Sequence, residues 1–175
     1  MAIKSKKAKE YLFVDGYNII NTWSNLRKLS NLNLEVAREE LIEIMAEYQH
    51  YSGIKIIVVF DAHLVKGNSG KQETIKGVRV VYTKENETAD QYIEKWLNDI
   101  GRIERVRVAT SDWMEQQIIL GRGGTRISAR ELEIEILNHK RLMKQKRKRE
   151  NVKNDLLMGR LDEETLKKLN KWGKK

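Results

Sequence analysis

Acidic side chains stand at recurring places in this sequence, directly after segments that are apolar enough to be buried strands. Three follow such strands immediately and two more open the helix after a fourth: Asp15, Asp61 and Asp112, then Glu87 and Asp90. Carboxylate oxygens are hard ligands that suit Mg²⁺ or Mn²⁺. Because gathered like charges repel unless a cation compensates them, such a set favours a divalent-metal site. A site of this kind can supply a water nucleophile for a phosphodiester.

Each of these acids also has a structural explanation, and for single positions that explanation is the stronger one. Aspartate is common in turns and as a helix cap. Ser111 or Asp112 can cap a following helix, and Asp61 can simply start a loop. Asn18 can orient Asp15 or a metal-bound water, or serve as a turn residue. Several acids at the same end of one sheet are harder to explain as caps alone.

Other chemistries are excluded or disfavoured by composition. The 175 residues contain no cysteine, which rules out disulfides, zinc–thiolate sites and thiol nucleophiles. Histidines with metal-ligand spacing are absent, so zinc is disfavoured, and GRGG lacks the Lys-Ser/Thr pair of a phosphate-binding P-loop. We expect no small-molecule cofactor beyond the metal.

Two alternating apolar patterns predict the elements that position these acids. β-Branched runs without polar alternation predict buried strands over 12–14, 54–60, 78–82 and 106–110, with a short last strand at 126–127. Helical periodicity appears over 34–51, 87–100, 113–120 and from 128 to about 150. The order predicts an α/β fold with a mainly parallel sheet. Since ligands bind where parallel strands end, this topology gathers the acids at one edge.

Boundary residues refine this assignment. Asn86 can cap the second helix, and Ser128 with Glu131 has the spacing of a capping box. The polar, glycine-rich segment 66–77 predicts a mobile loop. Residues 151–159 predict a break, followed by a short basic helix from Asp162 to about Trp172.

The net charge of +9 is concentrated at the two ends of the chain. Residues 139–175 hold 14 basic and 5 acidic residues, residues 1–10 carry +3, and residues 11–138 carry −3. We therefore divide the chain into a basic N-terminal extension (1–10), a body (11–138) and a basic helical tail (139–175). Basic arms on an acidic body favour contact with a polyanion, nucleic acid or the ribosome, although a solvated charged helix is the plainer explanation.

Candidate RNA or ribosome contacts lie in both the body and the tail. They are Lys66, Lys71, Arg122 and Arg126 in the body, and Lys140, Arg141, Lys144, Lys146, Arg147 and Arg149 in the tail. Lys66 and Lys71 can clamp a strand of RNA or belong to a plain flexible loop. Tyr17 and Trp23 can stack on bases or lie in the core.

Hydropathy gives no support for a membrane location. No stretch approaches the roughly 18 to 20 apolar residues of a membrane span, and the polar start MAIKSKKAKE is expected to be neither a signal peptide nor an anchor. We expect a cytoplasmic protein with no membrane partner.

Five segments in order resemble a known family. LFVDGYNII, IIVVFDAHLVKG, VVYTKENETADQYIEK, VATSDWMEQ and GTRISARELEIEI are similar to the YacP-like branch of the NYN nucleases, which are PIN-like. The similarity spans about residues 11–136. FDAHLVKG together with TKENETAD is specific to the branch, whereas VDGYN is shared by many NYN proteins.

The resemblance implies a PIN-like, three-layer α/β/α fold and metal-dependent RNA cleavage. For this branch it implies cleavage of mRNA in the ribosomal A site during translation, contributing to mRNA decay, with mRNA and rRNA as partners. By position, Asp15 of VDGYN and Asp90 of ETAD would be the essential metal-binding acids, with Asp112 also catalytic. Asn18, Asp61, Glu87 and Ser111 fall on the family's other polar positions.

Two alternatives stay open. The chain can be a PIN-like module without catalysis that binds RNA or the ribosome and recruits another nuclease, its acids then being caps and loop residues. A nuclease acting on DNA ends or flaps is disfavoured because the chain is short and shows no second domain to hold DNA.

Overall fold

The central feature of the fold is a single, mainly parallel sheet. The computed structural model describes residues 9–62, 70–100, 102–111 and 119–158. The strands are β1 (Glu10–Asp15), β2 (Lys55–Phe60), β3 (Gln72–Ile75), β4 (Val78–Tyr82), β5 (Arg105–Ala109) and β6 (Thr125–Ile127). Within these described residues they form one six-stranded sheet in the order β3-β4-β2-β1-β5-β6. All neighbouring pairs are parallel except β3–β4, so the predicted sheet is confirmed.

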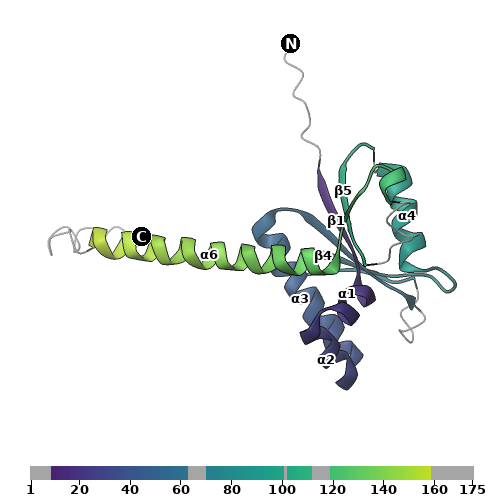
Figure 1. Cartoon of the computed structure of the whole chain (residues 1–175), viewed down its shortest axis with the longest axis horizontal. Helices are drawn as coiled ribbons and strands as arrows, with labels where there is room; N and C mark the ends of the chain where they lie inside the picture. Colours follow the sequence, from purple (N-terminus) through teal and green to yellow (C-terminus); the bar gives the residue numbers. More distant parts are fainter. Residues whose placement is uncertain (1–8, 63–69, 101, 112–118, 159–175) are drawn as a thin grey trace, which may run out of the picture. The chain divides into compact units, whose positions relative to one another are not determined.

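Helices cover both faces of this sheet and make the fold three-layered. The helices are α1 (Gly16–Thr22), α2 (Ser24–Leu32), α3 (Leu34–Ser52), α4 (Ala89–Ile100) and α6 (Ala129–Met158). Successive strand residues point to opposite faces. Leu12 and Val14 therefore join the core under α1–α3, whereas Phe13 joins the core under α4. Figure 1 shows α4 on one side of β1 and β5 and α1–α3 on the other. The α/β/α expectation is confirmed.

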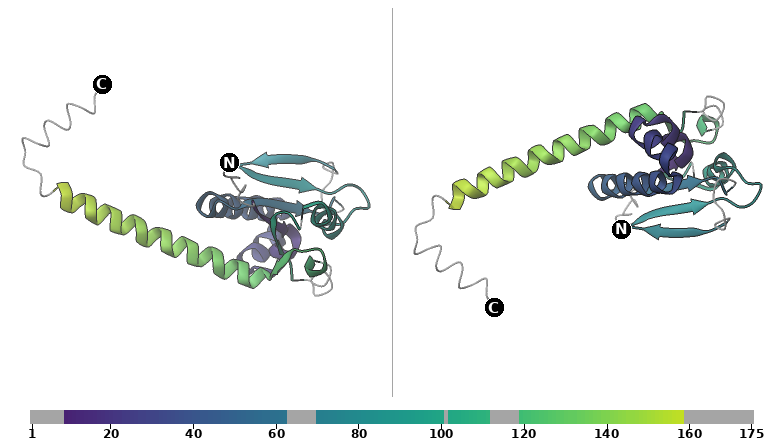
Figure 2. Two further views of the ribbon diagram at one scale, coloured as in Figure 1. Left: turned by 90° about the horizontal axis from the view of Figure 1, so that it is seen from above. Right: turned by 90° about the horizontal axis from the view of Figure 1, so that it is seen from below.

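The expectation of a mobile loop over 66–77 is wrong for its second half. Residues 72–75 form β3, which pairs antiparallel with β4 at one edge of the sheet (Figure 2). Ile75 pairs with Val78 across a two-residue turn in which Lys76 and Gly77 have φ of 49° and 89°. Such positive φ values are those of the tight turns that join hairpin strands. The polar sequence of β3 suits an edge strand. Because strands were predicted from apolar runs, this polar strand was missed.

The helix that carries Asp90 starts later than expected. Asn86 has φ of 67° and lies outside the helix, so it is not the cap. Instead the Thr88 hydroxyl accepts from the Gln91 backbone N–H at 3.2 Å, and the Thr88 N–H donates to the Gln91 side chain at 3.1 Å. This reciprocal pair is a capping box, and it places Ala89 and Asp90 in the first turn of α4.

Two further boundaries differ from expectation. The sequence from Gly16 to Leu32, which carried no helix in the prediction, forms α1 and α2. The expected break at 151–159 is also wrong, because α6 continues to Met158. No glycine or proline interrupts the chain between Ala129 and Met158, so nothing stops the helix there. The helix expected at 113–120 lies mostly outside the described residues, and the one expected from Asp162 lies wholly outside them.

The start of α6 is fixed to the body by polar contacts. The Ser128–Glu131 capping box is confirmed, with bonds of 2.7 and 3.2 Å. The Trp23 indole N–H donates to the Ala129 carbonyl at 2.8 Å, and the Arg107 guanidinium binds the Glu135 carboxylate through two bonds of 3.0 and 2.6 Å. Trp23 is therefore a core residue. The chain divides into two compact units, Met1–Ile136 and Leu137–Lys175, and α6 runs through the boundary.

In the portion of the chain that the structure describes, no helix is both long and apolar enough to cross a membrane.

Candidate active site

Asp15 lies where β1 meets α1, at the carboxyl edge of the parallel strands. It is the N-cap of α1, and its carboxylate accepts the Asn18 backbone N–H at 3.1 Å. The pKa of Asp15 is raised from 3.8 to about 6, mainly by burial and in smaller part by the negative charges of Asp90 and Asp61, while the bond from Asn18 opposes the shift. The three strand-end acids Asp15, Asp61 and Asp90 therefore interact electrostatically, as the topology predicted.

Asp61 connects the end of β2 to the helix that carries Asp90. The Ala89 backbone N–H donates to the Asp61 carboxylate at 2.6 Å. Ala89 is 2% exposed, so this bond sits where α4 begins against the sheet. The carboxylate satisfies one of the N–H groups left without a partner at the start of a helix. Asp61 thus holds the first turn of α4, and with it Asp90, beside the end of β1.

Asn18 joins α1 to the end of β5. Its side-chain oxygen accepts the Ser111 backbone N–H at 2.9 Å, while its own backbone N–H donates to Asp15. Asn18 thus contacts Asp15 through its backbone and, through its side chain, the segment that leads into Asp112. Asp112 itself lies outside the described residues. Ser111 is exposed and enters this arrangement through its backbone.

Glu87 has a different set of partners from the other candidate acids. Its carboxylate accepts from the Lys95 ammonium and from the Lys84 backbone N–H at 3.2 Å. The bond from Lys95 holds the pKa of Glu87 below its usual value. Glu87 also lines a cavity on the flank of α4 that faces β4. Its charge is therefore already balanced within the structure, in contrast to that of Asp15.

The glycine of VDGYN is required by packing. A Cβ atom at Gly16 would lie 2.2 Å from the ring of Phe60. That ring is fully buried and packs against Tyr17 and Tyr82, with ring centroids 5.2 and 5.7 Å away. Because only glycine lets α1 approach Phe60 so closely, Gly16 sets the position of Asp15 next to it. Tyr17 is 7% exposed, so it belongs mainly to the core.

Arg38 is a residue of this region that sequence reasoning missed. Its guanidinium donates to the Tyr17 hydroxyl at 3.2 Å, and its charge acts on Tyr82 as well as Tyr17. Tyr17 in turn feels the charge of Asp61. Among the described residues no carboxylate forms an ion pair with Arg38. Arg38 is a charged residue within the helix α3, and no motif or strand-end position in the sequence marks it as part of a site.

The predicted RNA contacts of the body differ in their surroundings. Lys71 forms an ion pair of 3.0 Å with Glu73, and Arg122 binds Glu94 and Asn98. The Arg126 Nε atom is buried with no hydrogen-bond partner in the described part of the chain. Lys66 lies outside that part.

The tail cations share one element. They all lie on α6 and, apart from half-buried Lys140, are exposed: Lys140, Arg141, Lys144, Lys146, Arg147 and Arg149.

The acids suit a hard divalent cation by chemistry, and they provide part of a ligand set. The negative charges of Asp90 and Asp61, which raise the pKa of Asp15, contribute to a negative potential of the kind that Mg²⁺ or Mn²⁺ neutralises. Among the residues described, no three His, Cys, Asp or Glu side chains are grouped closely enough to form a complete protein-only site. Mg²⁺ commonly keeps several waters and binds through one or two carboxylates, so Asp15 and Asp90 are compatible with it.

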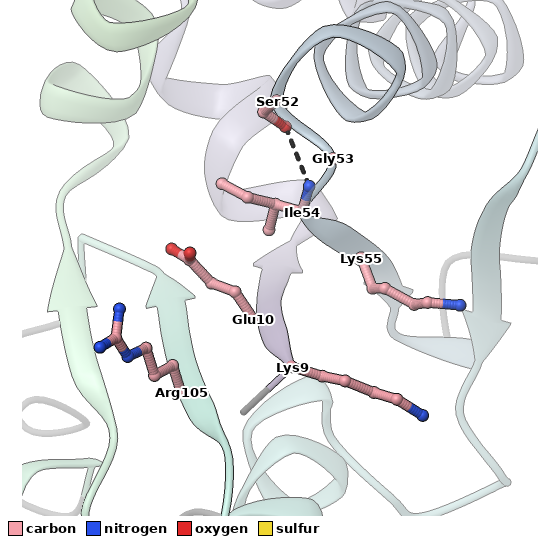
Figure 3. A pocket seen from close by; sticks show the side chains of 7 residues that line it. All are labelled: Lys9, Glu10, Ser52, Gly53, Ile54, Lys55 and Arg105. Atoms are coloured by element: carbon pink, nitrogen blue, oxygen red, sulfur yellow. Dashed lines mark hydrogen bonds between the residues drawn. The ribbon is translucent and has the colours of Figure 1, made fainter. Parts of the chain in front are cut away.

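One cavity beside the sheet lies away from the candidate acids. It measures about 450 Å³ and is lined by residues at the amino ends of β1, β2 and β5, including Glu10, Lys55 and Arg105. Figure 3 shows Ser52, Gly53 and Ile54 bordering the same space. Parallel strands bind ligands at their carboxyl ends. This cavity is consequently distinct from the candidate active site.

Comparison with known proteins gives one consistent result. A family model described as the YacP-like NYN domain matches residues 12–174. The YacP protein of Bacillus subtilis (strain 168) is 47% identical over 168 residues, covering 93% of this chain and 96% of YacP. The crystal structure of Rae1 (YacP) from Bacillus subtilis matches with a TM-score of 0.70 at 45% identity, covering 93% of this chain and 94% of that one.

A mutant of the same Bacillus protein matches with a TM-score of 0.66 at 44% identity, over 78% of this chain and 79% of that one. Sequence and structure therefore agree on a nuclease-like domain, and this chain belongs to the YacP-like NYN family.

Proposed function

We propose that this protein is a metal-dependent endoribonuclease that cleaves mRNA on the translating ribosome, in the A-site region, and so contributes to mRNA decay. The observation that supports it most is the electrostatic coupling of Asp15 to Asp90 and Asp61 at the carboxyl edge of the sheet. A carboxyl whose pKa is raised by burial together with specific charged neighbours is a candidate for a functional site. Membership of the NYN family supports the choice of a phosphodiester as substrate.

In this proposal Asp15 and Asp90 hold a Mg²⁺ or Mn²⁺ ion, with Asp61, Asp112 and Glu87 in direct or water-mediated support. When bound, the cation would stabilise the charge that develops on the phosphate and on an attacking water. The chain's own residues prepare the site. Asp61 holds the first turn of α4, and Asn18 holds the end of β5 against α1. Asp15 must be ionised to bind a cation, so affinity should rise with pH through about 6.

An acidic edge repels the phosphates of RNA, and cations must offset that repulsion. Arg38, held by the Tyr17 hydroxyl beside this edge, is placed to meet a phosphate of the substrate. In the second compact unit, the exposed cations of α6 would bind rRNA by neutralising its phosphates. The proposal thus assigns cleavage to the body and docking to the tail.

The test is to translate a defined mRNA in a purified system and map new 5′ ends. We expect the wild-type chain to produce them, and Asp90→Asn to lower the cleavage rate by roughly 100-fold or more, as loss of a metal ligand does. Asp90→Asn should still co-sediment with ribosomes, because α6 is unchanged. Glu40→Gln, which alters an exposed acid of α3, is the matched control and should cut normally. Cleavage that survives Asp90→Asn would show that the proposed site is wrong.

A second candidate is a PIN-like module that binds RNA or the ribosome and recruits another nuclease. Two observations favour it: Asp15 caps α1, and Asp61 accepts the first N–H of α4, which are structural roles. A calorimetric Mn²⁺ titration separates the two functions. Binding that disappears in Asp15→Asn supports the nuclease, whereas no binding in either protein supports the module.

A further inference from the structure

A second cavity lies beside α4, on the side that faces the β3–β4 hairpin. It measures about 250 Å³. Its lining includes Gln72 on β3, Lys84 and Glu87 before α4, and Tyr92, Lys95, Trp96 and Asp99 along α4. Of the acids in the proposed metal site, only Glu87 lines this cavity, so the proposed function does not yet give the cavity a role.

Helix geometry relates this cavity to the acidic edge. Ala89, Ile93 and Leu97 form the buried face of α4. At 100° per residue, Asp90 falls on one flank of that face, whereas Tyr92 and Trp96 fall on the opposite flank. The sheet order agrees, because β1, which carries Asp15, and β4, which lines the cavity, lie on opposite sides of β2. A strand of RNA whose phosphate lies near Asp90 therefore reaches the cavity by crossing the first turn of one helix.

The walls of the cavity suit a flat aromatic ligand. Trp96 is held by Phe13, with ring centroids 5.7 Å apart, and by the Arg79 guanidinium, 5.6 Å from its ring centroid. Tyr92 is half-buried one turn earlier. The volume is below the roughly 300 to 1,000 Å³ of pockets for drug-sized ligands, which favours a single base over a larger molecule. Aromatic side chains bind unstacked RNA bases in this way.

The polar groups at the rim are available for a ligand. Gln72 and Asp99 are exposed, and neither side chain has a hydrogen-bond or ion-pair partner among the residues that the structure describes. Glu87 is already neutralised by Lys95. The remaining cation, Lys84, is exposed between the cavity and the start of α4. An amide and a carboxylate can bind the edge of a base, and Lys84 its phosphate.

We propose that this cavity binds one unstacked base of single-stranded RNA, next to the scissile phosphate, with Tyr92 and Trp96 as its walls and Gln72 and Asp99 at its edge. The inference rests on the proposed nuclease function, since it names how the same substrate is held. It assigns α4 two roles, one flank for the catalytic acid and the other for base binding.

Photochemical crosslinking tests the location directly. The full chain carrying Asp90→Asn, so that RNA stays intact, is irradiated with a short single-stranded RNA that contains 5-iodouridine, and crosslinked peptides are mapped by mass spectrometry. A second arm uses the same substitution in mRNA on programmed ribosomes. We expect crosslinks at Tyr92 or Trp96 in at least one arm. Crosslinks confined to other residues, or none in both arms, would overturn the proposal.

Affinity measurements supply the second readout. Loss of one stacked base contact should weaken binding of the same RNA by about fivefold or more in Tyr92→Leu. Tyr51→Leu, at the other end of the sheet, is the matched control and should bind as the parent does. Asp99→Asn, an exposed change that leaves packing intact, should alter the preference among the four bases. Equal affinity in Tyr92→Leu and Tyr51→Leu would contradict the proposal.

Failure of the inference and failure of the proposed function give different results. If the wild-type chain cuts mRNA but no crosslink reaches the cavity, the nuclease stands and the base site is wrong. If RNA crosslinks to Tyr92 or Trp96 but the wild-type chain never cuts, the base site stands and the chain is the binding module instead.

Discussion

Asp15 carries an energetic cost that its proposed role explains. Its pKa is about 6 in the folded chain against 3.8 for an unperturbed carboxyl, so the folded state holds the proton more tightly than the unfolded state does. The stabilisation of the folded state that comes from this proton is complete below about pH 4, and it is lost as the pH rises through about 6. A shift of this size corresponds to at most on the order of 3 kcal/mol.

Asp15→Asn should therefore stabilise the metal-free protein near neutral pH. Asparagine caps a helix about as well as aspartate, so the cap of α1 is kept while the buried charge is removed. We expect a higher melting temperature than wild type in EDTA above about pH 7, and no difference near pH 4. Asp99→Asn, at an exposed acid, should leave the melting temperature unchanged at both pH values. A lower melting temperature for Asp15→Asn near neutral pH would contradict the assigned burial.

Gly16 gives a second prediction at this scale. Gly16→Ala places a methyl group against the Phe60 ring, which is fully buried and packed against Tyr17 and Tyr82. Overpacking of this kind costs about 1 to 3 kcal/mol, measured as the free energy of unfolding in urea. Gly121→Ala is the control, because nothing lies within 4 Å of the added carbon. Equal destabilisation by the two changes would show that the Phe60 contact is not the cause.

Single residues were predictable where one strong rule applied. An acid directly after a buried strand lies at the carboxyl edge of a parallel sheet whatever its neighbours are, and Asp15 and Asp61 followed that rule. Glu87 also follows a strand, yet Lys95, eight residues further on, neutralises it, a pairing that strand-end position does not reveal. Arg38 lay 23 residues from Asp15 in the sequence. Only the packing of α3 on Tyr17 brings it to the site.

At the scale of elements, prediction depended on whether a segment was apolar. Buried parallel strands are marked in a sequence by continuous β-branched runs, so β1, β2, β4 and β5 were predicted correctly. β3 is a polar edge strand that needs its partner and a tight turn to exist, and its burial pattern alternates instead of being continuous. The helix α2 exposes most of its residues and buries only Leu26, which leaves little periodicity to detect.

The helix α3 supplies Arg38, which donates to the Tyr17 hydroxyl, and this gives a prediction for the element. Arg38→Gln should reduce cleavage about tenfold, mainly through a higher KM, because a lost phosphate contact weakens substrate binding. The salt dependence of RNA binding should also become shallower, by about one phosphate contact. Arg27→Gln, an exposed arginine on α2, serves as the control. A change confined to kcat, with unchanged KM and salt dependence, would exclude a binding role.

Tyr17→Phe tests whether the hydrogen bond from the Arg38 guanidinium to the Tyr17 hydroxyl matters for the role of Arg38. The change removes only the hydroxyl that Arg38 contacts at 3.2 Å and keeps the ring packed on Phe60. Because Arg38 remains charged, we expect a smaller loss than in Arg38→Gln, in the same kinetic parameter. A larger loss would assign the effect to Tyr17 itself.

At the scale of the whole molecule, the densest basic run and the candidate acids occupy different units. The acids belong to the unit Met1–Ile136, and the densest basic run belongs to Leu137–Lys175. This separation was predictable from counting charges along the sequence, because net charge needs no knowledge of packing. The contacts that fix the start of α6 were not predictable, since they join residues that are far apart in the sequence. Trp23 and Ala129 are 106 positions apart, and Arg107 and Glu135 are 28 positions apart.

The separation predicts that docking can be removed without touching the active site. Changing Lys144, Lys146, Arg147 and Arg149 together to Gln should strongly reduce co-sedimentation with ribosomes, since each lost phosphate contact lowers the salt slope by about 0.7 to 0.9. The control changes four exposed cations of the body, Arg27, Lys28, Arg102 and Arg105, to Gln, which alters the net charge equally. If both quadruple variants lose binding alike, net charge alone drives association. If the α6 variant binds ribosomes as wild type does, the tail is not the docking element, because the four neutralised side chains lie on consecutive turns of one exposed helix and no other change accompanies them.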